Sequence, residues 1–269
     1  MKYKLSLVLT IFCLGLILTS CARADHKVTL EKDSVKQQVM ITAQTLTPLA
    51  ATVTPAPKPL MPLIFLDPGH QLKGNNELEY LGPNSKVKKP KVTSGTRGIS
   101  TKKTEFQLNL DVSLLLRDIL VAKGYRVQMT RDKNEVNLSN KERALMANKA
   151  KADLFVRVHA DGNDKSTVNG ISIQYPIENS STKTIKAKPS KLAAEAMLKA
   201  VIKETGAKSR GIVPRGDLAG FNWSEVPSVL IEMGFMTNKK EDNLMATKSY
   251  QEKLAKGMLI GIEQWLAEG

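Results

Sequence analysis

Apolar runs and amphipathic stretches alternate along the chain from residue 63 to its C-terminal end. A short apolar run bounded by turn residues is typical of a buried strand, and apolar positions three or four residues apart are typical of a helix. The apolar runs predict strands at LIFLD (63–67), YRVQMT (125–130), DLFVRVHA (153–160), GISIQYP (170–176) and VPSVLIEMGF (226–235). The amphipathic stretches predict helices at 104–124, 139–152, 190–206 and 249–269, with N-caps at Ser139 and Ser190.

This alternation of strands and helices predicts an α/β fold. We expect residues 63–269 to form a single domain with a mostly parallel, twisted sheet flanked by helices. In open sheets of this kind, ligands bind beyond the carboxyl ends of the strands. A functional site is therefore expected at that edge of the sheet.

One stretch inside the expected domain does not follow the alternation. Residues 71–103 are polar, are interrupted by Gly and Pro, and show neither a strand pattern nor a helix pattern. A structureless loop of this length inside a compact domain is usually functional or disordered. We interpret the stretch as a long irregular loop, either functional or disordered.

The N-terminal end carries the pattern of an export signal. Lys2 and Lys4 precede an apolar run, Leu5–Leu18, which is short for a membrane-spanning helix. The run ends in LTSC (18–21), which resembles a bacterial lipobox. We therefore expect residues 1–20 to be a lipoprotein signal peptide and Cys21 to become the lipidated first residue. The Pro- and Thr-rich residues 21–62 predict a flexible tether.

Charge and cysteine content narrow the choice of partners and sites. The formal net charge is +14, which favours anionic partners. Export argues against nucleic acid and leaves anionic wall polymers or a membrane surface as partners for the basic residues. The only cysteines are Cys13 and Cys21, both in or at the end of the signal. The mature chain is thus expected to have neither a disulfide framework nor a Cys-ligated zinc site.

Three chemically active side chains fall where predicted strands end. His70 follows the first strand, His159 closes the strand at 153–160, and Glu232 lies in the last strand, after PSVLI. Because parallel strands end at one edge of a sheet, we expect these side chains to meet there. Two neutral imidazoles and a carboxylate suit Zn²⁺, although each residue alone is equally explained by an ordinary loop hydrogen bond or salt bridge.

A hydrolytic zinc site also needs a third ligand and a general base. Spacing along the chain does not choose between the acidic candidates, which are Glu77, Glu79, Glu105, Asp161, Glu225 and Glu232. Glu105 would begin a helix that enters from the same edge of the sheet.

With these residues in place, the sequence resembles a known family, the zinc-dependent N-acetylmuramoyl-L-alanine amidases of the type called amidase 3. The matching segments occur in the family's order from Leu63 to the C-terminus. They are FLDPGH (65–70), TEFQLNL (104–110), MTR (129–131), RALMANKAKADLFVRVHADG (143–162) and VPSVLIEMGFMTNKKEDNLM (226–245). The long 71–103 stretch departs from the family, where many members have a short glycine-rich link.

The resemblance implies that His70, Glu105 and His159 are zinc ligands and that Glu232 is the catalytic carboxylate. It implies hydrolysis of the amide bond between N-acetylmuramic acid and L-alanine in peptidoglycan. Together with the lipobox, it leads us to expect an exported monomer that is lipid-anchored to the cell membrane and faces the cell wall.

Alternative functions and two further candidate residues remain open. The same fold could serve a non-catalytic wall-binding lipoprotein, against which Glu232 counts, or a zinc peptidase that cuts a different wall peptide bond. Arg215 precedes the last strand and could pair bidentately with a stem-peptide carboxylate. Asn222 is expected to line the groove. The alternative interpretation of Arg215 is a solvated surface arginine.

Overall fold

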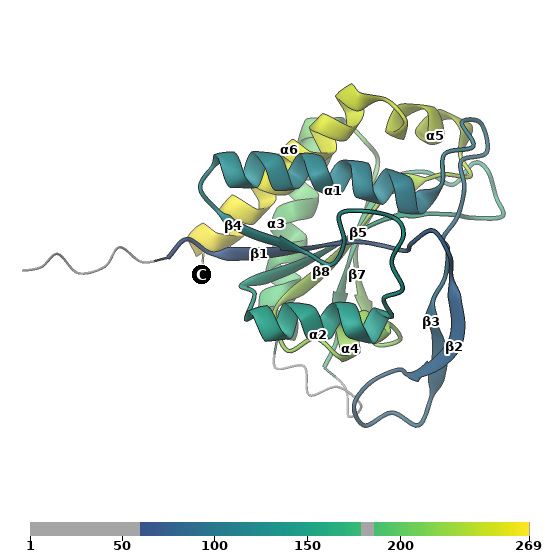
Figure 1. Ribbon diagram of the computed structural model, residues 1–269. Helices are drawn as coiled ribbons and strands as arrows, with labels where there is room; N and C mark the ends of the chain where they lie inside the picture. Colours follow the sequence, from purple (N-terminus) through teal and green to yellow (C-terminus); the bar gives the residue numbers. More distant parts are fainter. Residues whose placement is uncertain (1–59, 179–185, 269) are drawn as a thin grey trace, which may run out of the picture. The chain divides into compact units, whose positions relative to one another are not determined.

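The computed structural model of the protein describes residues 60–178 and 186–268 (Figure 1). The expected signal peptide, Cys21 and nearly all of the expected tether lie outside the described residues. Within the described part of the chain, no helix is both long enough and apolar enough to cross a membrane.

The described elements follow the predicted alternation and add several that the sequence did not indicate. The strands are β1 (Leu63–Pro68), β2 (Asn75–Tyr80), β3 (Lys88–Val92), β4 (Arg126–Met129), β5 (Leu154–Asp161), β6 (Ile171–Pro176), β7 (Ser209–Arg215) and β8 (Ser228–Phe235). The helices are α1 (Glu105–Ala122), α2 (Asn140–Ala150), α3 (Ala187–Thr205), α4 (Ala219–Asn222), α5 (Lys239–Met245) and α6 (Lys248–Glu268).

Six strands form the main sheet, in the order β4-β1-β5-β8-β6-β7. Neighbouring strands are parallel except β6 and β8, which are antiparallel. Helices α1, α3 and α6 cover one face of the sheet, and α2 and α4 lie against the other (Figure 1). The predicted α/β fold with a mostly parallel, flanked sheet is therefore confirmed.

The first strand shows why the sheet is buried on both faces. All six residues of β1 are buried. Ile64 and Leu66 belong to the larger core, which includes apolar residues of α1, α3 and α6. Leu63 and Phe65 point the other way and pack with residues of α2. A strand covered on both faces reads as a continuous apolar run, which is why this segment was predictable.

Residues 71–103 differ from the expected irregular loop. They contain β2 and β3, which pair antiparallel as a hairpin separate from the main sheet (Figure 1). Polar contacts fasten this hairpin to the domain. Trp223 Nε1 donates a hydrogen bond to the Tyr80 carbonyl at 2.8 Å, and Asn140 Nδ2 donates to the Lys91 carbonyl at 2.9 Å.

The two predicted helix caps have different outcomes. Ser139 and Glu142 form the reciprocal capping box at the start of α2, as expected. The prediction for Ser190 is wrong, because α3 begins about one turn earlier, at Ala187. Ser190 Oγ instead donates to the Lys186 carbonyl at 2.6 Å and accepts from the Ser228 backbone N–H at 2.9 Å.

Candidate metal centre and catalytic site

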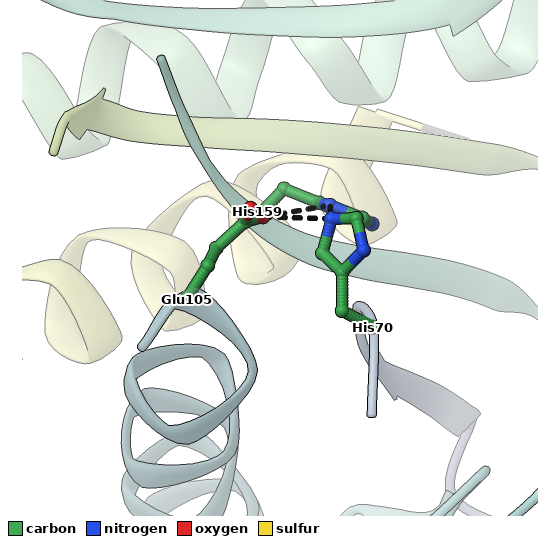
Figure 2. A group of neighbouring side chains, drawn as sticks. All are labelled: His70, Glu105 and His159. Atoms are coloured by element: carbon green, nitrogen blue, oxygen red, sulfur yellow. Dashed lines mark hydrogen bonds and ion pairs between the residues drawn. The ribbon is translucent and has the colours of Figure 1, made fainter. Parts of the chain in front are cut away.

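Three side chains from separate elements converge at the carboxyl edge of the sheet (Figure 2). His70 follows β1, Glu105 is the first residue of α1, and His159 lies in β5. His70 Nε2 lies 3.0 Å from Glu105 Oε1, and His159 Nδ1 lies 3.2 Å from the same oxygen. The two ring nitrogens are 3.1 Å apart. Each residue therefore presents one ligand atom to a common point.

This donor set fits a divalent metal ion. Zinc bonds of about 2.0–2.2 Å at tetrahedral angles place neighbouring ligand atoms roughly 3.3 Å apart, close to the three separations here. Burial lowers the pKa of His159 to about 4, so its imidazole is neutral at pH 7 and can act as a ligand. Two neutral imidazoles and a carboxylate are typical protein ligands of zinc.

Hydrogen bonds fix which atoms of His70 and Glu105 face the centre. His70 Nδ1 donates to the Thr93 carbonyl at 2.9 Å, so the proton is on Nδ1 and the lone pair of Nε2 faces the other ligands. Glu105 Oε2 accepts from the Thr96 backbone N–H at 2.9 Å. Burial opposes ionisation of Glu105, but the neighbouring imidazoles of His159 and His70 outweigh it and hold the Glu105 pKa well below its ordinary value.

Additional donors reach the other carboxylate oxygen of Glu105. Asn109, one helical turn further along α1, places Nδ2 3.2 Å from Oε1, and the backbone N–H of Ala160 is at the same distance. Position 95 must be a glycine, because a Cβ there would lie 2.5 Å from Glu105 Oε2 and its φ is +77°. Thr93, Gly95, Thr96 and Asn109 were not predicted from the sequence; only the TSG turn at 93–95 hinted at a close backbone approach.

Glu232 lies beside the ligand cluster on the neighbouring strand. In the β5–β8 pairing, His159 and Glu232 are register partners. We expected these two side chains at the ends of their strands. Both strands instead continue beyond them, to Asp161 and Phe235. Burial, assisted by the nearby carboxylates of Glu105 and Asp161, raises the Glu232 pKa well above its ordinary value. A raised pKa suits a carboxylate that gains and loses a proton near neutral pH.

The two carboxylate oxygens of Glu232 have different surroundings. Oε1 lies 3.4 Å from Gln174 Nε2, which donates to it. Oε2 is buried and has no hydrogen-bond partner among the described residues. The Glu232 side chain lines a hollow of about 280 Å³ together with His70, His159 and Arg215. The hydrogen-bonding capacity of Oε2 is thus unused by the described residues.

The arginine predicted to bind substrate lines the hollow, but its donors are already engaged. Arg215 Nε and Nη2 donate to the two oxygens of Asp217 at 2.7 and 3.0 Å. Arg215 Nη1 donates to Gln174 Oε1 at 2.8 Å. Asn222 is buried away from the hollow, and its Nδ2 donates to the Gly216 carbonyl at 2.9 Å. Among the described residues, Asn222 thus contacts the turn after Arg215 rather than the groove.

The remaining acidic candidates lie outside the ligand cluster. Glu77 is exposed and pairs with Lys91 at 2.6 Å. Glu79, in strand β2 of the hairpin, accepts a hydrogen bond from the Lys141 backbone N–H at 3.1 Å. Asp161 accepts from the Gly162 backbone N–H at 2.7 Å, and Glu225 is exposed. Among the described acidic candidates for the third ligand, Glu105 is thus the one that lies with His70 and His159 in a group able to hold a metal ion.

The turn that carries His70 is held by buried charges. The Asp67 carboxylate, which is fully buried, accepts from Arg143 at 2.7 Å and from Arg157 at 2.8 Å. Arg131 donates to the carbonyls of Pro68 and Gly69, both at 2.9 Å. These contacts explain why the DPGH segment and the TR segment occur together: the arginine fixes the backbone that positions the histidine.

Comparison with known proteins gives a consistent match over the domain. A family model described as N-acetylmuramoyl-L-alanine amidase (amidase 3) matches residues 64–264. The chain is 28% identical over 235 residues to an N-acetylmuramoyl-L-alanine amidase of Mycobacterium tuberculosis, covering 85% of this chain and 96% of that protein. It is 29% identical over 198 residues to the N-acetylmuramoyl-L-alanine amidase LytC of Bacillus subtilis, covering 74% of this chain and 34% of LytC.

Solved structures agree with the sequence matches. An N-acetylmuramyl-L-alanine amidase from Mycobacterium smegmatis superposes with a TM-score of 0.70 at 28% identity, covering 79% of this chain and 100% of that structure. The catalytic domain of CwlV, an N-acetylmuramoyl-L-alanine amidase from Bacillus (Paenibacillus) polymyxa, superposes with a TM-score of 0.62 at 28% identity, covering 77% and 99%. The residues matched by the family model include the ligand cluster and Glu232.

Proposed function

Because the chain belongs to the N-acetylmuramoyl-L-alanine amidase family, we propose that it is a zinc-dependent hydrolase of peptidoglycan. The bond cleaved joins N-acetylmuramic acid to the L-alanine of the stem peptide. The observation that carries this proposal is the convergence of His70 Nε2, Glu105 Oε1 and His159 Nδ1, with separations of 3.0–3.2 Å, beside the buried carboxylate of Glu232.

In this proposal, His70, Glu105 and His159 would hold one zinc ion. When bound, zinc lowers the pKa of a water molecule to about 7 and polarises a carbonyl group. The protein supplies the orientation: Thr93 fixes the His70 tautomer, and the backbone N–H of Thr96 holds the outer oxygen of Glu105.

Glu232 is the proposed acid–base group. Its Oε2 atom, which has no hydrogen-bond partner among the described residues, accepts a proton from water as the water oxygen attacks the lactyl carbonyl carbon. Gln174 holds Oε1 at 3.4 Å. As the carbon–nitrogen bond breaks, Glu232 returns the proton to the departing alanine nitrogen. The products are a glycan strand with a free lactyl carboxylate and a stem peptide with a free amino end.

Other parts of the chain are assigned more general roles. We propose that Arg215 contacts the stem peptide in the hollow and that Asn222 supports the turn that follows Arg215. The protein is proposed to act as a monomer, with its basic surface binding anionic wall polymers. Residues 1–20 are proposed to direct export, and Cys21 to carry a lipid anchor at the start of a 21–62 tether.

The new ends formed in purified sacculi test the proposed reaction. The zinc-loaded protein should release stem peptides that begin with L-alanine and leave glycan strands without new reducing ends. New amino ends inside the stem or cross-link would indicate a peptidase instead. Binding to sacculi without any new ends would indicate a wall-binding protein without catalytic activity.

A further inference from the structure

Two cationic side chains at the edge of the hollow, Arg215 and Lys89, already bind the carboxylate of Asp217, and we call this pair the cationic fork. The Asp217 carboxylate accepts two hydrogen bonds from Arg215, at 2.7 and 3.0 Å. Lys89, on strand β3 of the hairpin, places Nζ 3.5 Å from Asp217 Oδ2 and donates to the Asp217 carbonyl at 2.6 Å. The hydrogen bond from Arg215, with help from Lys89, lowers the Asp217 pKa to about 2, so Asp217 is ionised at pH 7.

The contact between Asp217 and the fork is exposed and therefore replaceable. The side chains of Asp217 and Lys89 are 55% and 44% exposed. Water therefore competes for the charges of Asp217 and Lys89, whereas Arg215 is 30% exposed and holds Asp217 through two hydrogen bonds. A second carboxylate brought into the hollow by the rest of a bound substrate could replace Asp217, because it would accept the same two hydrogen bonds from Arg215 and free Asp217 to be hydrated.

The arginine would remain in place after such an exchange. Its third donor, Nη1, contacts Gln174 Oε1 at 2.8 Å, and Gln174 is only 8% exposed. Because arginine only donates hydrogen bonds, Gln174 must present its oxygen to Arg215 and its amide nitrogen to Glu232. Gln174 thus links Arg215 to Glu232, and both side chains line the hollow in which the stem peptide is proposed to bind.

We propose that Arg215 and Lys89 form a subsite for a free carboxylate on the second residue of the stem peptide, and that Asp217 occupies this subsite until substrate binds. This inference rests on the proposed amidase function and deepens it. It also assigns a role to the hairpin, because β3 contributes one of the two cations. Stem peptides in which this carboxylate is converted to a carboxamide should fit the fork less well, since a neutral amide cannot replace an ionised carboxylate.

The test uses two muropeptides that differ only in having a carboxylate or a carboxamide on the second stem residue. The measured quantity is the ratio of kcat/KM for the carboxylate form to kcat/KM for the carboxamide form. Asp217→Asn removes the internal competitor and should raise this ratio roughly two- to fivefold, the range expected for an exposed pair. Lys89→Met should lower it. Glu77→Gln is the matched control, since it removes an exposed carboxylate from the same hairpin at a distance from the hollow, and should leave the ratio unchanged.

The outcomes separate this inference from the function on which it rests. A lower ratio for Asp217→Asn would mean that Asp217 only orients Arg215, and an unchanged ratio in both hollow variants would mean that no carboxylate subsite exists there. Either result overturns the inference while the amidase function stands. If the parent protein cleaves neither muropeptide, the proposed function fails. Binding then tests the subsite directly, by titrating both muropeptides into the zinc-loaded parent and Asp217→Asn proteins. Equal affinities for the carboxylate and carboxamide muropeptides would overturn the subsite.

Discussion

Gly69 and His159 are in such close contact that no other residue can occupy position 69 without moving the imidazole. A Cβ atom at this position would lie 2.2 Å from both Cε1 and Nε2 of His159. Non-bonded carbon and nitrogen atoms do not approach this closely, so the glycine is required by the ring beside it. The Gly of the DPGH segment is thus needed for the local turn and also to leave room for the imidazole of His159 on a strand distant in sequence.

Gly69→Ala should therefore displace His159 while leaving the sheet intact. We expect zinc affinity to fall roughly 10- to 100-fold, the range seen when groups that orient metal ligands are altered. Competition with a chelator of known affinity measures the change, and circular dichroism checks the fold. Gly124→Ala is the control, since position 124 has a positive φ but open space around it, and should cost stability without changing zinc affinity. Unchanged zinc binding by Gly69→Ala would argue against His159 as a ligand.

The ligand cluster predicts one tightly bound zinc ion per chain. Removing zinc with a chelator should abolish activity and lower the melting temperature, because the folded site binds the ion and the unfolded chain does not. His70→Ala and His159→Ala should lose the ion, and so should Glu105→Ala. Elemental analysis of the purified proteins provides the measurement, with Glu77→Ala as a control that keeps its zinc. Full zinc content and activity in Glu105→Ala would show that the third ligand has been misassigned.

The sheet and the histidines were predictable from the sequence because burial and strand ends leave clear patterns. The segments of β1 and β5 are apolar runs in the sequence. One of the two histidines of the domain follows β1, and the other lies near the end of β5. Spacing could not select the third ligand, because several acidic residues lie in regions of unknown path. Only the entry of α1 next to the end of β1 distinguishes Glu105 from Glu79, which the structure places in strand β2 of the hairpin.

The hairpin escaped prediction for a different physical reason. β3 contains Pro90 and carries mostly lysines, and neither strand buries an apolar face of the kind that produces a regular alternation. Its position depends on individual polar contacts with distant residues, such as the bond from Trp223 to the Tyr80 carbonyl. Contacts of this kind leave no periodic signal in the sequence. Lys89 and Asp217 consequently could not be recognised as neighbours.

The buried charges around Asp67 make a prediction about stability and pH. Although burial opposes ionisation, Arg143 and Arg157 outweigh it and hold the Asp67 pKa far below its ordinary value. Since the folded-state pKa is depressed, this stabilisation is fully present above about pH 4, where the unfolded chain is also ionised, and declines as the pH falls below that value. Chemical unfolding of the parent protein between pH 3 and pH 7 should show this loss.

Removing the Asp67 charge should have a large effect at neutral pH. Asp67→Asn leaves Arg143 and Arg157 without their buried partner and should cost about 3–5 kcal/mol of unfolding free energy. Asp118→Asn, which removes an exposed carboxylate paired with Arg117, should cost less than about 1 kcal/mol. Similar losses in the two variants would show that Asp67 does not anchor the turn before His70.

The N-terminal sequence predicts a lipid anchor on Cys21. Cys21→Ala should leave the protein unprocessed or release it from the membrane fraction, because the thiol is the site of acylation. Mass spectrometry of the mature parent protein should find acyl chains on an N-terminal Cys21. A mature end at another residue, without acyl chains, would contradict the predicted anchor.

Glu232 provides the most direct test of the central claim, which is that a base beside the metal centre drives amide hydrolysis. Glutamine has nearly the same shape, so Glu232→Gln should fold and bind zinc like the parent, yet it cannot accept the proton. Its rate of releasing stem peptides with new L-alanine amino ends from purified sacculi should fall roughly a hundredfold or more. The comparison requires equal amounts of folded, zinc-loaded protein. A Glu232→Gln protein that meets these conditions and is as active as the parent would contradict the mechanism.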